Sequence, residues 1–96
     1  LFHGGVSGAI ADNAAGFAAM TLMDREKEPL TIEFKINFLN IADGEKLVAE
    51  AEILQAGRSI FHGESKVYTI KKNEKLLTAT ALVTIKATSK VSEKLR

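Results

Sequence analysis

The chain contains no cysteine, which excludes disulfide bonds, thiolate metal sites and a thiol nucleophile. Its formal net charge of +1 gives no reason to expect nucleic acid or an anionic membrane as a partner. No run of about 18 apolar residues occurs, so no membrane span is expected. The first apolar stretch has no basic region before it, which argues against a signal peptide. We therefore expect a cytoplasmic protein.

The length and composition predict one globular domain over residues 1–96. A chain of 96 residues can form a single core of moderate stability. Its 46% of hydrophobic and 26% of charged residues are typical of globular rather than disordered proteins. The sequence contains no internal repeat and no low-complexity segment.

Residues 5–23 favour a helix because they contain six alanines and no proline. Only Asp12 and Asn13 are strongly polar in this segment. A helix that is apolar nearly all round is expected to be buried. A carboxylate there is unfavourable unless it has a partner. Asp12 is therefore the first candidate for a functional residue.

The remainder of the chain predicts strands joined by short turns. A charged connection over residues 24–29 ends at Pro29, which cannot continue a helix. Strands are expected over residues 31–38, 46–55, 59–71 and 75–87. We interpret them as an antiparallel meander curled around the helix, which is an α+β fold.

Alternation of apolar and polar residues predicts which side chains of the first strand share a face. Ile32, Phe34, Ile36 and Phe38 alternate with polar residues, so Thr31 is expected on the opposite face. The alternation of the third strand is irregular around residues 62–63, where a bulge is plausible.

The segment His3-Gly4-Gly5, followed by Asp12 and by a strand that opens with Thr31, resembles the hotdog-fold acyl-CoA thioesterases. It is most similar to the phenylacetate-pathway-like branch, and the resemblance covers the whole chain. It implies a hotdog fold, in which an antiparallel sheet wraps around one long buried helix. Members of the family carry further residues before this motif, so we expect the natural domain to begin before Leu1.

The resemblance implies hydrolysis of an acyl- or aryl-CoA, with coenzyme A as part of the substrate and no further cofactor. Asp12 would be the nucleophile or the general base, and His3 would shape the loop that holds the Gly4 amide. Thr31 would hold the attacking water. Independently of the family, a helix that starts at Gly4 and Gly5 offers free N–H groups to an oxyanion, and glycine lets a ligand approach closely.

The spacing of these residues predicts a site shared between two subunits. Seven residues separate Gly5 from Asp12, which places them roughly 10 Å apart along one helix axis. One carbonyl group cannot easily reach both. Two helices related by a two-fold axis would bring Gly4 of one subunit to Asp12 of the other. We therefore expect a homodimer with two sites and an inactive monomer, and similar proteins often pair dimers into tetramers.

The turn Gly57-Arg58-Ser59 resembles the loop that lies near the nucleotide end of coenzyme A in such proteins. An arginine suits phosphate because its guanidinium group can donate two parallel hydrogen bonds. No metal site is expected, because His62 has no second ligand at a suitable spacing.

Two alternative functions stay open at the level of sequence. The same fold could form a non-catalytic acyl-CoA-binding or regulatory module, although pure binding gains little from a carboxylate beside an anionic ligand. It could also form a hydratase or dehydratase, which would pair His3 with Asp12 across two subunits.

Overall fold

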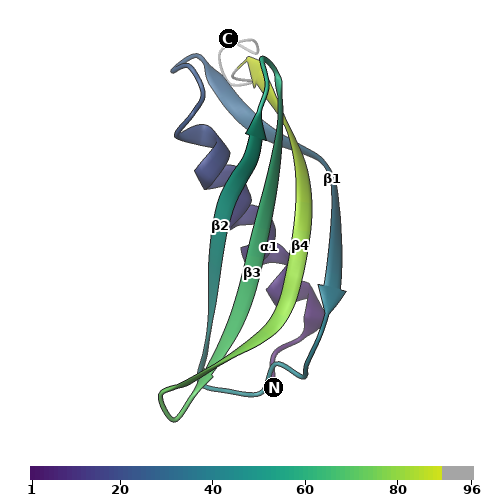
Figure 1. The fold of residues 1–96 in the computed structure, drawn as a ribbon, viewed down its shortest axis with the longest axis vertical. Helices are drawn as coiled ribbons and strands as arrows, with labels where there is room; N and C mark the ends of the chain where they lie inside the picture. The colour runs from purple at the N-terminus through teal and green to yellow at the C-terminus, as the bar shows by residue number, and fades with distance from the viewer. Residues whose placement is uncertain (90–96) are drawn as a thin grey trace, which may run out of the picture.

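The computed structural model describes residues 1–89 and places one helix against one face of a four-stranded antiparallel sheet (Figure 1). The elements in chain order are α1 (Gly4–Met20), β1 (Lys27–Phe38), β2 (Lys46–Ala56), β3 (Ile60–Lys71) and β4 (Glu74–Ser89). The expected α+β class is confirmed. Within residues 1–89, no helix has both the length and the apolar character needed to cross a membrane.

The order of the strands in the sheet is β1-β4-β3-β2, which corrects the expected four-stranded meander. Strands β2, β3 and β4 are neighbours in sequence and in space, but β1 pairs with β4 at the far edge. Residues 39–45 connect the two edges of the sheet. Two strands separate β1 from β2, a distance of roughly 14 Å that seven extended residues easily span.

Strand β1 also begins earlier than the sequence indicates. It starts at Lys27 and includes Pro29, which the sequence places in a loop. Proline is tolerated because β1 lies at the edge of the sheet, where a missing N–H need not face a partner strand. Pro29 lies opposite Ala87 of β4.

The core forms where α1 crosses the sheet. Ala11, Ala15 and Ala19 recur every four residues, so they form one stripe along the helix, and all three are fully buried. Their small side chains let α1 approach the inward-facing apolar residues of β3 and β4, among which Val67 and Ile85 are fully buried. This packing fixes which side of the helix faces the sheet.

The opposite side of α1 is not buried within one chain, contrary to the expectation from its composition. Phe17 is 65% exposed, and Val6 and Met20 are also exposed. Leu30 and Phe38 of the edge strand β1 are exposed as well. A single subunit therefore leaves apolar surface uncovered on α1 and β1.

Two irregularities in the sheet bear on the predictions made from alternation. The first lies in β1 between Thr31 and Glu33, where one extra residue enters the strand. The second lies in β2 between Ile53 and Gln55, opposite the residues at which the sequence suggests a bulge. The extra residue is therefore on β2 rather than on β3.

Candidate active site

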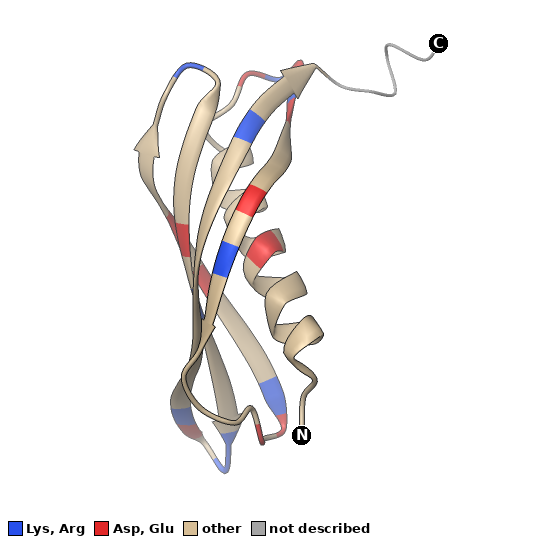
Figure 2. Ribbon diagram, turned by 90° about the vertical axis from the view of Figure 1, so that its right-hand side faces the viewer, with Lys and Arg blue, Asp and Glu red and all other residues tan. Residues whose placement is uncertain are grey.

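Asp12 is the only charged residue of α1, which is otherwise tan along its length in Figure 2. Its side chain is half-buried and accepts a hydrogen bond from Thr31, with a distance of 2.6 Å between Oγ1 and Oδ1. A charge-assisted bond of this kind is short and strong. Thr31 thus provides the partner that a carboxylate in an apolar helix requires.

The bulge in β1 directs Thr31 toward the helix, which corrects the face predicted from alternation. Thr31 pairs with Ile85, whereas Glu33 pairs with Thr84, so Ile32 is the extra residue. One added residue reverses the phase of the side chains beyond it. Thr31 can therefore reach α1 although Phe34 also lies toward it.

His3 caps the start of α1 and uses the Gly5 amide to do so. The Gly5 N–H donates to His3 Nδ1 at 2.9 Å, and the Val6 N–H donates to the His3 carbonyl at 2.9 Å. The Gly4 N–H, the first of the helix, has no hydrogen-bond partner within the described chain. Gly4 therefore keeps the free donor that an oxyanion needs, whereas the Gly5 donor is already occupied.

Two hollows flank Asp12. The larger, of about 570 Å³, lies between the first half of α1 and the inner face of β1, and extends from Gly4 to Asp12. The smaller, of about 230 Å³, lies on the other side and includes Asn13, Gly16 and Thr31. The Asp12 carboxyl group thus borders both hollows.

The turn Gly57-Arg58-Ser59 does not lie near Asp12 within one chain. It joins β2 to β3 at the end of the sheet remote from the N-terminus (Figure 1). None of its residues lines either hollow beside Asp12. Gly57 suits this turn because a Cβ there would lie 2.7 Å from the Ile60 carbonyl oxygen.

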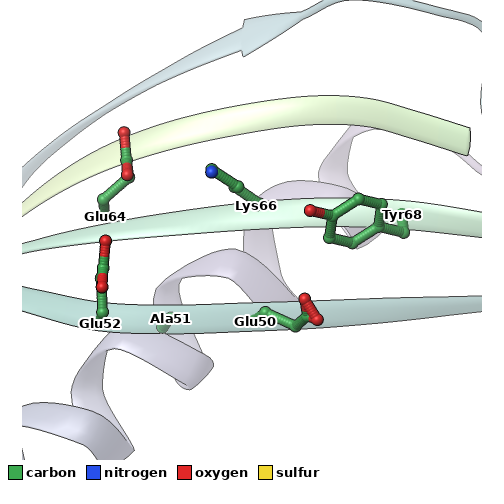
Figure 3. A pocket seen from close by; sticks show the side chains of 6 residues that line it. All are labelled: Glu50, Ala51, Glu52, Glu64, Lys66 and Tyr68. Carbon is green, nitrogen blue, oxygen red and sulfur yellow. The ribbon is translucent and has the colours of Figure 1, made fainter.

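A separate pocket of about 250 Å³ lies on the sheet face turned away from α1 (Figure 3). Glu50 and Glu52 extend from β2, and Glu64, Lys66 and Tyr68 extend from β3. Lys75 of β4 pairs with Glu50 at 3.1 Å and covers the Tyr68 ring. The sheet separates this pocket from Asp12. Among residues 1–89, no three His, Asp or Glu side chains could together hold a metal ion.

Sequence reasoning missed two features of the site. Ser65 of β3 is fully buried and donates to the Ala11 carbonyl at 2.7 Å, directly before Asp12 in the chain. Its only signal is a small polar residue at an inward-facing position. Gly8 and Phe34 face one another across the larger hollow. The sequence places Gly8 in a helix and Phe34 in a strand, but it does not indicate that the two residues lie close together.

The chain matches the model of the thioesterase superfamily over residues 1–75. A thioesterase family protein from Silicibacter pomeroyi is 36% identical with a TM-score of 0.91, and the match covers 94% of this chain and 66% of that one. An acyl-CoA hydrolase from Agrobacterium tumefaciens is 26% identical with a TM-score of 0.82, and the match covers 91% of this chain and 36% of that one.

A Bacillus halodurans protein whose structure contains CoA is 24% identical with a TM-score of 0.86, and the match covers 92% of this chain and 60% of that one. At that identity the similarity extends to the fold alone. The chain spans less than two thirds of the length of these proteins. No curated protein sequence is significantly similar to it. The family model, together with the helix-on-sheet architecture, shows that the chain belongs to the thioesterase superfamily and has its hotdog fold.

Proposed function

We propose that this protein hydrolyses an acyl- or aryl-CoA thioester to the free acid and coenzyme A. The observation that carries the proposal is the Asp12–Thr31 pair, a carboxylate held at 2.6 Å by a hydroxyl group beside two open hollows. Membership of the thioesterase superfamily supports this chemistry, as does the similarity to a protein named an acyl-CoA hydrolase.

Asp12 can act in either of two ways. As a general base it takes a proton from water, and the resulting hydroxide attacks the thioester carbon. The tetrahedral intermediate then collapses, the C–S bond breaks, and the coenzyme A sulfur receives the proton from the carboxyl group. As a nucleophile Asp12 instead attacks the carbon itself and expels the thiolate, and water then cleaves the mixed anhydride.

Thr31 contributes through the direction in which its hydroxyl group donates its hydrogen bond. Its hydrogen is directed to Asp12 Oδ1, so its oxygen lone pairs are left to accept a hydrogen bond. A water molecule that donates to Thr31 would be held beside the carboxylate. We assign Thr31 the role of positioning the attacking water.

The Gly4 amide supplies the oxyanion donor, and in this proposal it comes from the partner subunit's copy of the same helix. The positive end of the helix dipole adds to the attraction of its N–H for negative charge. Exposed apolar residues on α1 and the free edge of β1 support a homodimer through this side. Dimers could pair further into tetramers through the outer face of the sheet.

Arg58 would contact a phosphate of coenzyme A, because its exposed turn resembles the loop near the nucleotide end of coenzyme A and a guanidinium group can donate two parallel hydrogen bonds to phosphate. Coenzyme A would be bound only as part of the substrate, and no metal or other cofactor takes part. His3 would act through the hydrogen bond that it accepts from the Gly5 N–H, which keeps the first turn of α1 in place.

The test measures thiol release from a panel of acyl- and aryl-CoAs by the full-length protein and by its Asp12→Asn variant. We expect turnover to fall at least about a hundredfold in the variant, while the mass of the assembly stays the same. Binding of acyl-CoA without any thiol release by the wild type would instead favour the non-catalytic binding module. Hydration of an enoyl-CoA would favour a hydratase.

A further inference from the structure

Glycines make up much of the helix side of the larger hollow beside Asp12, where Gly4, Gly5 and Gly8 lie with Ala9 and Asp12. Gly4 and Gly8 lie one turn apart on the same side of α1. A Cβ on Gly8 would lie 3.7 Å from the tip of the Phe34 ring, and one on Gly4 would lie 3.1 Å from the tip of the Phe38 ring. The aromatic rings of β1 thus face bare helix backbone.

The walls of this hollow are apolar. Phe34, Ile36 and Phe38 line it from β1. Its only ionisable side chains are His3, which accepts from the Gly5 amide, and Asp12, which accepts from Thr31. No lysine or arginine lines it, and its one free backbone donor, the Gly4 N–H, is assigned to the oxyanion of a thioester. A carboxylate on the acyl group would therefore find no cationic partner in the hollow and would be repelled by Asp12.

The smaller hollow has a different character. It contains the hydroxyl group of Thr31 and the amide of Asn13 beside the other edge of Asp12. These groups suit water. The rest of its lining includes the apolar side chains of Phe17, Met20 and Pro29, so the polar groups lie beside Asp12 and Thr31 rather than throughout the hollow. The two sides of Asp12 therefore differ in what they can hold.

We propose that the larger hollow binds the acyl group of the thioester, that this group is uncharged and apolar, and that Gly8 and Phe34 determine how large it can be. The inference rests on the proposed function, because it requires the thioester carbon to lie beside Asp12, with its oxygen at the Gly4 amide supplied by the partner subunit. Burial of apolar surface stabilises such a group, and longer groups gain more. A charged end group receives no compensating partner in the hollow.

The first experiment compares pentanoyl-CoA with glutaryl-CoA, in which a carboxylate replaces the terminal methyl group. We expect kcat/KM for pentanoyl-CoA to exceed that for glutaryl-CoA at least about a hundredfold, because the charge is buried without a partner. Equal values for the two substrates would overturn the assignment of an uncharged acyl group.

The second experiment tests in which hollow the acyl group binds, with two alanine variants of α1. Gly8→Ala adds a methyl group to the larger hollow, and we expect it to lower kcat/KM for phenylacetyl-CoA about tenfold more than for acetyl-CoA. Gly16→Ala is the matched control. It makes the same change in helix propensity, and nothing lies within 4 Å of the added Cβ. Gly16→Ala should leave the ratio of the two substrates unchanged.

A shift of this ratio in Gly16→Ala, and not in Gly8→Ala, would place the acyl group in the smaller hollow and overturn the proposal. Phe34→Ala provides an independent variant, since removing the ring should raise the relative kcat/KM of acyl groups larger than phenylacetyl. An unchanged order of substrates in both Gly8→Ala and Phe34→Ala would also overturn it.

A failure of the proposed thioesterase function can be distinguished from a failure of the acyl-site assignment. If the wild type cleaves no thioester, binding of the stable thioether S-pentyl-CoA is measured by calorimetry. Weaker binding by Gly8→Ala, with unchanged binding by Gly16→Ala, would keep the hollow as the apolar ligand site of a non-catalytic module. No binding of S-pentyl-CoA to the wild type would overturn both proposals.

Discussion

Thr31 Oγ1 lies 2.6 Å from Asp12 Oδ1 and donates to it, although 19 positions separate the two residues in the chain. The contact joins the middle of α1 to the edge strand β1, directly before the bulge at Ile32. Asp12 borders both hollows, and Thr31 lines the smaller one. Three features of the fold therefore meet at one hydrogen bond.

Replacing Thr31 with valine removes the hydroxyl group and leaves the shape of the side chain nearly unchanged. A hydrogen bond to a charged group contributes about 1.5–3 kcal/mol, so we expect kcat to fall roughly tenfold to a hundredfold. Thr31→Ser keeps the hydroxyl group and serves as the control, with kcat within a few-fold of wild type. Equal activity of Thr31→Val and Thr31→Ser would refute the role assigned to the hydroxyl group.

The Gly4 amide can be removed without breaking the helix, because proline is well tolerated at the first helical position. His3 already has the extended conformation that precedes proline, with φ −68° and ψ 144°. We expect Gly4→Pro to lower kcat about a hundredfold to a thousandfold, as for the loss of one oxyanion donor. Steady-state thiol release measures the effect.

Gly4→Ala is the matched control for that variant, because it places a Cβ against the Phe38 ring but keeps the N–H. It should retain most of the kcat that Gly4→Pro loses. A similar loss in both variants would attribute the effect to crowding at Phe38 and not to the donor.

Much of the fold follows from the sequence. The alanine content and the lack of proline identify the helix, and alternation with period 2, although irregular in the third strand, identifies the strands. The order of the strands does not follow from the sequence, because an apolar face indicates that a strand covers the helix and not which strand lies beside it. The orientation of Thr31 also could not be predicted. The bulge at Ile32 reverses the alternation, and no glycine marks it in the sequence.

The candidate site was predictable only where a residue departs from its surroundings. Asp12 stands out in an apolar helix, and the resemblance to thioesterases adds His3 and Gly4. Ser65 shows no such contrast, because a serine in a strand is common and its bond to the Ala11 carbonyl joins positions 54 residues apart. Contacts between residues so far apart in the chain form only when the helix packs on the sheet, so the sequence pattern does not indicate them.

Ser65→Ala should lower the free energy of unfolding by about 1 kcal/mol, because a fully buried hydrogen bond is lost. In a chain of this size the loss corresponds to a decrease in Tm of roughly 4–8 °C. Thermal unfolding followed by circular dichroism measures it. Ser89→Ala, at an exposed position near the end of β4, should leave Tm nearly unchanged. Equal Tm values for the two variants would contradict a stabilising role for the Ser65 bond.

Mixing of inactive subunits provides the direct test of a shared site. Asp12→Asn lacks the carboxylate and Gly4→Pro lacks the oxyanion donor, so each homodimer should be nearly inactive. If each site takes Asp12 from one subunit and Gly4 from the other, a mixed dimer carries both defects in one site and none in the second. Random reassociation of equal amounts should then restore about a quarter of wild-type activity.

The restored activity also distinguishes the shared site from a site within one chain. When Asp12 and Gly4 of the same subunit act together, every site in the mixture carries one defect, and no activity returns. Mixing should be carried out by denaturing and refolding the two variants together, with the same treatment of each variant alone as the control. Size-exclusion chromatography then checks that the mixture has the mass of the wild-type assembly, so that a lack of activity reports on the arrangement of the site and not on failed association.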